Sequence, residues 1–167
     1  MSAMNTSSTQ DLVSQLASAL LKKRWHLSTA ESCTGGLVAA TITELAGSSD
    51  WFERGYVTYS NSAKSEDIHV SPELITQHGA VSDQVARAMA IGAKQSSHTE
   101  VALSITGIAG PTGGSTQKPV GTVCFAWILA NDAVHSETKL FSGNRQEVRQ
   151  QACEFSLRKL LELVHSF

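Results

Sequence analysis

Two hydrophobic periods alternate along this chain, and their order restricts the folds that it can adopt. Apolar residues recur at the spacing of an amphipathic helix from Leu12 to Leu20 and again in the segment that follows Asn144. Between them, His26–Ala30 and Val101–Ile105 are short segments that indicate buried strands. Amphipathic helices and strands bury their apolar faces by packing in layers, so this chain is expected to pack helices against a sheet.

The remaining elements complete this pattern. Gly55–Tyr59 is rich in β-branched and aromatic residues and predicts a strand, and a short helix is expected to open at Asn61 or Ser62. Val120–Ala130 and Ala133–Leu140 are typical of an antiparallel hairpin. Three further helices are expected to begin after the capping residues Ser71, Ser82 and Asn144. An α-connected part followed by a hairpin predicts an α/β fold, a three-layer α/β/α sandwich around a mixed sheet.

A single domain accounts for the whole pattern. With 167 residues, of which 41% are hydrophobic and 17% are charged, the chain can bury one ordinary core. Residues 1–9 are polar and rich in Ser and Thr, so they are expected to form a flexible tail. One domain is expected over residues 10–167.

Charge and cysteine usage exclude several classes of protein. The net charge of -2 argues against a general affinity for nucleic acid or for an anionic membrane. Three widely spaced cysteines form no CxxC pair and six histidines show no ligand spacing, so neither a disulfide framework nor a metal site is expected. The first residues lack the features of a secretory signal, and no apolar run is long enough to span a membrane. We therefore expect a cytoplasmic protein.

The segment Ala30–Gly36 (AESCTGG) joins a predicted strand to a predicted helix and is the first candidate for chemistry. The N-terminus of a helix presents free N–H groups and a partial positive charge, which suit an oxyanion or a phosphate. Ser32 can attack a carbonyl there while nearby N–H groups hold the developing negative oxygen. Alternatively, Ser32 or Thr34 merely caps the helix. Cys33 is a second candidate nucleophile, although a buried, inert thiol is the commoner state.

Tyr59 and Lys64 form the second candidate. A strand that ends at Tyr59 and a helix that begins near Asn61 would let both side chains face one site. A serine nucleophile needs a base, and because no histidine lies near either motif, a lysine whose pKa is lowered by burial can serve. Alternatively, Lys64 is a solvated surface residue and Tyr59 a half-buried strand residue. Glu31, the one carboxylate in these segments, orients the loop or Lys64, or lies in solvent.

A glycine-rich stretch, Thr106–Pro119, has no regular period and is expected to be a long functional loop. Its small residues leave backbone amides free to surround an anion. The G-K-[ST] ending of a nucleotide-triphosphate loop is missing, because a proline follows Lys118, so an ATP site is disfavoured. Arg145, at the start of the last helix, offers a planar fork for a phosphate or carboxylate. The alternatives are a mobile surface loop and an exposed Arg145 without a ligand.

Taken together and in this order, these motifs resemble the CinA C-terminal domain family, whose stand-alone members are nicotinamide mononucleotide deamidases. Seven matches in register are far more specific than any one glycine loop. The matching segments are AESCTGG at 30–36, AGSSDWFERGYVTYSN at 46–61, Lys64, HGAVS at 78–82, SITGIAGPTGGS at 104–115, KPVGTV at 118–123 and FSGNR at 141–145.

The resemblance implies hydrolysis of nicotinamide mononucleotide to nicotinate mononucleotide and ammonia. It also implies a fold similar to the anticodon-binding domain, a homodimer, and an activity without a metal or other cofactor. The family's serine falls on Ser32 and its lysine on Lys64, with Tyr59 as a proton relay. The residues expected to bind the oxyanion or the 5'-phosphate are Thr34, Gly35, Gly36, Thr106, Gly107, Gly110, Gly113 and Arg145.

Two other functions stay open. One is a non-catalytic interaction module related to competence or damage, as the family's name suggests. Since Ser32, Tyr59, Lys64 and Arg145 are all present, the sequence shows no sign of a degenerate site. The other is an amidase for a different small amide, which would not recognise the phosphate.

Overall fold

One five-stranded sheet forms the centre of the molecule. The computed structural model describes residues 6–167. The strands follow the order β2-β1-β3-β4-β5 across the sheet, with β1 parallel to both β2 and β3, and with β4 and β5 antiparallel to their neighbours. This arrangement confirms the predicted mixed sheet. The strands are β1 (Leu27–Glu31), β2 (Phe52–Val57), β3 (Val101–Gly107), β4 (Thr122–Ile128) and β5 (Val134–Leu140).

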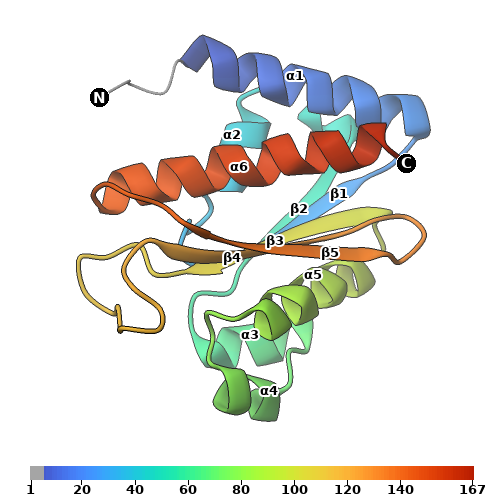
Figure 1. The fold of residues 1–167 in the computed structure, drawn as a ribbon. Helices are drawn as coiled ribbons and strands as arrows, with labels where there is room; N and C mark the ends of the chain where they lie inside the picture. Colours follow the sequence, from blue (N-terminus) through green and yellow to red (C-terminus); the bar gives the residue numbers. More distant parts are fainter. Residues whose placement is uncertain (1–5) are drawn as a thin grey trace.

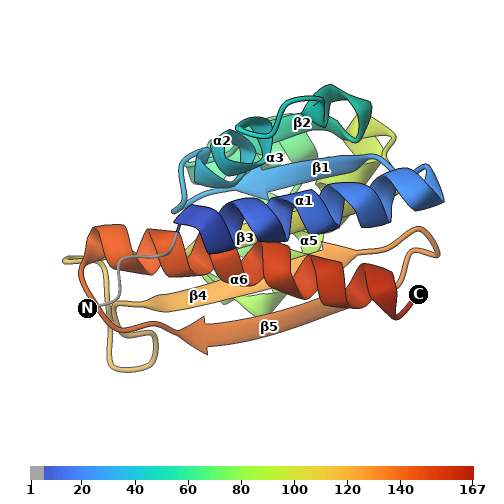
Figure 2. The ribbon, with the colours of Figure 1, turned by 90° about the horizontal axis from the view of Figure 1, so that it is seen from above.

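Helices cover both faces of the sheet, so the predicted three layers are also confirmed (Figure 1). One outer layer contains α1 (Thr6–Lys23), α2 (Leu37–Thr43), a short 3-10 helix (Ser48–Asp50) and α6 (Arg145–His165). The other contains α3 (Asn61–Ile68), α4 (Pro72–His78) and α5 (Asp83–Ser97). Seen from above, α1 and α6 lie side by side over the strands (Figure 2). Among the described helices, none combines the length and apolar character that a membrane crossing requires.

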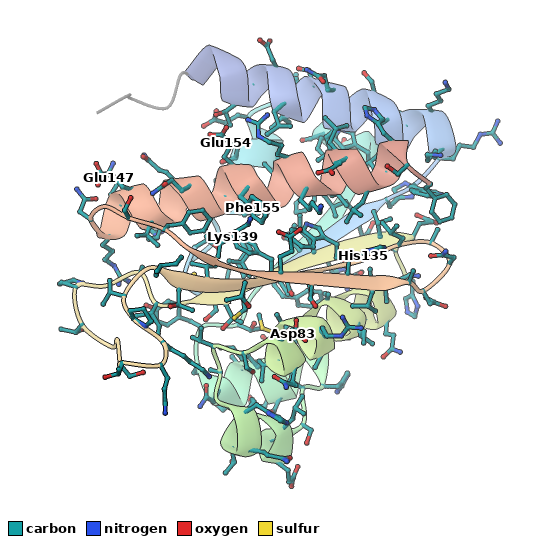
Figure 3. All side chains as sticks on the ribbon, viewed as in Figure 1. Asp83, His135, Lys139, Glu147, Glu154 and Phe155 are labelled. Carbon is teal, nitrogen blue, oxygen red and sulfur yellow. The ribbon has the colours of Figure 1, made fainter. Side chains whose placement is uncertain are left out.

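A hydrophobic core lies on each side of the sheet. On the α6 side, Phe155 packs against Phe125 with ring centroids 4.9 Å apart, and the Lys139 ammonium lies over the Phe155 ring. Figure 3 shows Phe155 and Lys139 between α6 and β5. Fully burying a phenylalanine such as Phe125 contributes about 1.5–3 kcal/mol, and the partly buried Phe155 adds to this contact, so these residues help to hold α6 on the sheet. This matters for the site, because the first turns of α6 carry two arginines toward it.

The predicted helix caps are present. Ser71 and Ser82 accept hydrogen bonds from Leu74 N and Val85 N, and Asn144 forms a capping box with Glu147. These local hydrogen bonds explain why the sequence places the starts of α4, α5 and α6 accurately.

Several boundaries differ from the sequence-based expectation. α1 begins at Thr6, so residues 6–9 belong to this helix and not to a tail, whereas residues 1–5 lie outside the described residues. β2 occupies residues 52–57 and stops before Tyr59. The last bond at this end of the strand runs from Thr58 N to the Glu31 carbonyl. Beyond it the chain turns into α3, whose cap is Ser60.

The close approach of α5 to α3 holds the lysine-bearing helix in place. A Cβ on Gly92 of α5 would lie 1.9 Å from the Ile68 carbonyl oxygen at the end of α3. Glycine at this position therefore lets the two elements touch through their backbones. This packing against α5, and not the short helix by itself, holds α3 and its Lys64 in position.

Candidate active site

The candidate site lies where the chain leaves three adjacent parallel strands. Ser32 follows β1, Lys64 follows β2 by one turn of α3, and Thr106 stands near the end of β3. Ligands commonly bind outside the carboxyl ends of parallel strands, since the loops converge there. A cavity of about 320 Å³ opens at this edge, lined by Ser32, Cys33, Tyr59, Asn61, Lys64, Ala80, Val81, Thr106, Gly107, Ile108, Ala109, Gly110, Thr112, Gly113 and Arg145.

Ser32 is fixed by the sheet although it stands just beyond β1. Its N–H donates to the Ile105 carbonyl of β3 over 3.0 Å, which continues the strand pairing by one bond. Its side chain reaches the cavity with 8% of the residue exposed. The Ser32 Oγ lies 3.3 Å from the Lys64 Nζ. Two groups 32 positions apart in the sequence are therefore in direct contact.

Lys64 is buried, with 1% of its surface exposed, so the reading of a solvated surface lysine is wrong. Its Nζ donates to the carbonyls of Thr58, Tyr59 and Ser60 over 2.9, 3.2 and 3.4 Å. Burial lowers the pKa of this ammonium, because removing a charge from water disfavours the charged form. Lys64 thus has the contact and the direction of pKa shift that a general base for Ser32 needs.

Glu31 is fully buried, and its side chain caps the N-terminus of α2. Its carboxylate accepts hydrogen bonds from Val38 N at 2.9 Å and Ala39 N at 3.1 Å. Neither Ser32 nor Thr34 acts as the cap, and Glu31 neither lies in solvent nor contacts Lys64. The Glu31 carboxylate therefore occupies N–H groups of α2 that were expected to bind an oxyanion or a phosphate.

The three residues after Cys33 are placed differently from the expectation. Thr34, Gly35 and Gly36 do not line the cavity. The Gly35 N–H donates back to the Ser32 carbonyl over 3.0 Å, and Gly36 adopts a left-handed conformation with φ of 98° at the start of α2. These residues form the turn that presents Ser32, and their contact with a ligand stays a prediction without geometric support.

Arg145 spans the mouth of the cavity. Its Nη1 donates to the Gly110 carbonyl over 2.8 Å, and its Nη2 donates to the Tyr59 hydroxyl over 3.2 Å. Tyr59 is 60% exposed, and it is its backbone carbonyl, not its hydroxyl, that contacts Lys64 and Ser32. Because Ser32 and Lys64 touch directly, the geometry does not require a proton relay through Tyr59.

The glycine-rich stretch forms part of the cavity wall. Thr106 belongs to β3 and not to the loop, and its buried hydroxyl donates to the Ala80 carbonyl over 2.9 Å. Lys118 ties the far end of the loop to the His78 carbonyl over 2.9 Å. Gly107, Gly110 and Gly113 all line the cavity, and their contact with a substrate stays a prediction. Among the described loop residues that line the cavity, four have an N–H group without a protein acceptor: Ala109, Gly110, Thr112 and Gly113.

A family model places this chain among known proteins. The model described as the CinA C-terminal domain matches residues 9–164. The chain belongs to the CinA C-terminal domain family. This CinA domain is 50% identical over 157 residues to the "nicotinamide-nucleotide amidohydrolase PncC" of Escherichia coli strain K12, which covers 94% of this chain and 95% of that protein. The protein of the same description from Enterobacter agglomerans is 50% identical over 151 residues, 90% of this chain and 92% of the relative.

The fold of this CinA domain is shared with solved structures. A competence-damaged protein (CinA) superfamily protein from Klebsiella pneumoniae superposes with a TM-score of 0.91 at 34% identity, covering 95% of this chain and 99% of that one. A competence/damage-inducible protein from Agrobacterium tumefaciens gives a TM-score of 0.90 at 41% identity, with 93% and 94% covered. The α/β architecture is therefore that of the CinA superfamily.

Cys33 of this CinA domain is a poor nucleophile despite its place in the cavity wall. Only 6% of the residue is exposed, and burial raises the pKa of the thiol to about 12. The thiol is therefore protonated at neutral pH and inert, as the sequence reading favoured. In the described part of the chain, no group of three or more His, Cys, Asp or Glu is placed to hold a metal ion.

Arg149 holds the turn that presents Ser32, a role that was not predicted from the sequence. Its Nε donates to the Cys33 carbonyl over 3.1 Å and its Nη2 to the Thr34 carbonyl over 2.9 Å. Residues four apart share a helix face, so the position of Arg149 relative to Arg145 was a signal that it points toward the same site.

Proposed function

We propose that this CinA domain is a nicotinamide-nucleotide amidohydrolase, which converts nicotinamide mononucleotide and water to nicotinate mononucleotide and ammonia. The observation that carries this proposal is the 3.3 Å contact of Ser32 Oγ with the buried Lys64 Nζ, inside a cavity that fits a small molecule. Two relatives of nearly the same length, each 50% identical, bear the name of this activity, which supports the choice of substrate.

The first half of the reaction forms an acyl-enzyme. The neutral Lys64 amine takes the hydroxyl proton of Ser32 while the Ser32 oxygen attacks the carboxamide carbon. The resulting tetrahedral oxyanion collapses, the C–N bond breaks, and the Lys64 ammonium returns the proton to the departing nitrogen as ammonia. The carbonyls of Thr58 and Tyr59 hold the Lys64 Nζ in place throughout, because each accepts one of its hydrogens.

The second half repeats the same proton transfers with water. Lys64 removes a proton from a water molecule that attacks the ester carbon of acylated Ser32. The Ser32 oxygen leaves and takes the proton back from Lys64, which releases nicotinate mononucleotide and restores both groups. One amine thus serves as base and acid in turn, a role suited to a lysine whose pKa lies below its ordinary value.

Recognition of the nucleotide falls to the other side of the cavity. The loop amides of Ala109, Gly110, Thr112 and Gly113 offer N–H groups to the 5'-phosphate, and Arg145 at the cavity mouth offers its planar fork. The Arg145 guanidinium would exchange its present acceptors, the Gly110 carbonyl and the Tyr59 hydroxyl, for phosphate oxygens.

The direct experiment measures ammonia released from nicotinamide mononucleotide by the purified chain in a coupled assay. Release with a stoichiometric yield of nicotinate mononucleotide is expected. If no ammonia appears, the chain is not this enzyme, and the alternative of a non-catalytic interaction module is favoured. A cytoplasmic location and a homodimer stay predictions, and light scattering after size-exclusion chromatography measures the oligomeric state.

The pH profile tests the role of the buried lysine. The active form of Lys64 is the neutral amine, so kcat/KM is expected to rise with pH as the ammonium loses its proton. Because burial lowers the pKa of Lys64, the inflection is expected below the ordinary lysine value of about 10.4. No histidine lines the cavity, so the inflection is not expected from a histidine. A kcat/KM that does not rise with pH anywhere below the ordinary lysine value would contradict Lys64 as the base.

Replacing Arg145 by glutamine tests phosphate recognition. We expect the KM for nicotinamide mononucleotide to rise about tenfold or more, because a hydrogen bond to a charged group contributes about 1.5–3 kcal/mol. The matched comparison is nicotinamide riboside, which lacks the phosphate. Wild type and Arg145→Gln should hydrolyse the riboside with equal kcat/KM. An equal loss on both substrates would show that Arg145 does not act on the phosphate.

A further inference from the structure

The guanidinium of Arg149 lies at the end of a short series of hydrogen-bonded peptide groups. Its Nη2 donates to the Thr34 carbonyl over 2.9 Å. The N–H of the same peptide group, which belongs to Gly35, donates to the Ser32 carbonyl over 3.0 Å. The N–H of that second peptide group belongs to Cys33, the residue after the nucleophile. Two peptide groups therefore connect the Arg149 charge with the Cys33 amide.

The Cys33 amide is the candidate donor to an oxyanion that forms at Ser32. Cys33 lines the cavity beside Ser32, and no other described residue accepts a hydrogen bond from its N–H. The N–H of Ser32 itself is taken, because it donates to the Ile105 carbonyl. The first N–H groups of α2 are also taken, since Val38 and Ala39 donate to Glu31. Within the turn after β1, the amide next to the nucleophile is thus the available donor in the cavity wall.

We propose that Arg149 is a positioning residue that strengthens the Cys33 N–H as a donor to the oxyanion through the peptide groups of Thr34 and Ser32. This inference rests on the proposed amide hydrolysis at Ser32. A hydrogen bond to a carbonyl shifts electron density along the peptide group and makes its N–H a stronger donor. A charged donor at the start of the series has a larger effect than a neutral one.

A second contact of Arg149 fixes the turn that carries these groups. The Arg149 Nε donates to the Cys33 carbonyl over 3.1 Å, so one guanidinium holds two successive carbonyls. Arg149 belongs to α6, whose apolar face is packed against the sheet through Val148 and Ala152. The anchor is therefore rigid, and the donor is aimed before the substrate arrives. Preorganised donors of this kind stabilise a transition state without reorganisation during the reaction.

The kinetic test compares Arg149→Met, Arg149→Gln and Arg149→Lys with wild type. Removing an oxyanion donor outright costs about 100- to 1,000-fold in kcat, so weakening one is expected to cost about tenfold. Arg149→Met should therefore lower kcat about tenfold and leave the KM for nicotinamide mononucleotide unchanged. Arg149→Gln keeps a neutral donor, and Arg149→Lys keeps the charge. Arg149→Lys should therefore retain a higher kcat than Arg149→Gln. Arg158→Met, on the exposed face of the same helix, is the matched control and should retain full kcat.

An NMR measurement tests the polarisation without relying on activity. In 15N-labelled protein, the amide protons of Cys33 and Gly35 are expected to move upfield in Arg149→Met, because the series that joins their peptide groups loses its charged donor at the Thr34 carbonyl. The Ser32 amide lies next to them but outside the series, so its proton should keep its position. Arg149→Lys should move the two resonances less than Arg149→Gln does. If Arg149→Met does not fold, the Gln and Lys variants carry the same comparison.

The outcomes separate this inference from the proposed function. If wild type releases no ammonia, the proposed function fails, while the amide resonances still decide whether Arg149 polarises the turn. If wild type is active but Arg149→Met and Arg149→Gln keep full kcat, the inference is overturned. It is also overturned if KM and kcat change together, or if the Ser32 resonance shifts as much as those of Cys33 and Gly35. A loss of kcat at constant KM, with shifts at Cys33 and Gly35 and none at Ser32, supports it.

Discussion

Replacing Ser32 by alanine is expected to lower kcat for nicotinamide mononucleotide by about 1,000-fold or more, as for other enzymes that lose their nucleophile. The removed oxygen is the atom that forms the covalent bond to the substrate, and the neighbouring thiol of Cys33 cannot replace it because burial raises its pKa to about 12. The measurement is ammonia release under saturating substrate, with binding of nicotinamide mononucleotide followed separately by calorimetry. Binding should persist, since the cavity loses one oxygen atom.

Ser28→Ala is the matched control for this substitution. Ser28 is a fully buried serine of β1, the strand that Ser32 follows, and its hydroxyl contacts Thr99 away from the cavity. Its loss is expected to cost about 1 kcal/mol of stability, as for one buried hydrogen bond, with no loss of kcat. If Ser32→Ala released ammonia at nearly the wild-type rate, the nucleophile would have to be another group, such as a bound water.

Replacing Lys64 by methionine is expected to lower kcat by a similar factor, about 1,000-fold, and to remove the rise of kcat/KM with pH. Methionine keeps the length and shape of the side chain without an amine that can accept a proton. Lys64→Arg makes the distinction sharper, because a guanidinium keeps the positive charge and the donors but does not lose its proton in proteins. Both variants should be inactive if Lys64 is the base, whereas Lys64→Arg should be active if the positive charge alone matters.

Lys94→Met is the control for the loss of a lysine. Lys94 is largely shielded as well, and its Nζ donates to the Leu129 carbonyl and pairs with Asp132 far from the cavity. This variant should keep its pH profile and kcat. Thermal unfolding of the Lys64 variants is measured alongside, because the carbonyls of Thr58, Tyr59 and Ser60 lose a donor when the ammonium is removed.

Much of the fold could be predicted because its signals are local. Ser82 caps α5 and Asn144 caps α6 through hydrogen bonds that span three residues, so short stretches of sequence contain the whole interaction. The hairpin of β4 and β5 is likewise a contact between neighbours in the chain, and its predicted ends differ from the observed ones by two residues or fewer. The order of the motifs along the chain, from AESCTGG to FSGNR, was enough to recognise the resemblance to the CinA C-terminal domain family.

The strand order and the details of the site could not be predicted in the same way. β1 lies between β2 and β3, which follow it in sequence, and this order depends on how helices pack over both faces. The end of β2 depends on where its pairing with β1 stops, which is why Tyr59 is outside the strand and exposed. The sequence left the role of Glu31 open between orienting the loop, orienting Lys64 and lying in solvent, because a buried carboxylate becomes favourable only when backbone N–H groups are turned toward it.

The sequence by itself determined which residue types are available, a hydroxyl after a strand and an amine near the start of a short helix, and it determined most helix boundaries through local hydrogen bonds and apolar spacing. Tertiary structure alone decided that Ser32 and Lys64 meet at 3.3 Å, that the amine is shielded from water, and that Arg149 reaches the turn from the last helix. The physical reason is that burial and contact between distant segments depend on the packing of all three layers, and burial is what lowers the pKa of the Lys64 ammonium.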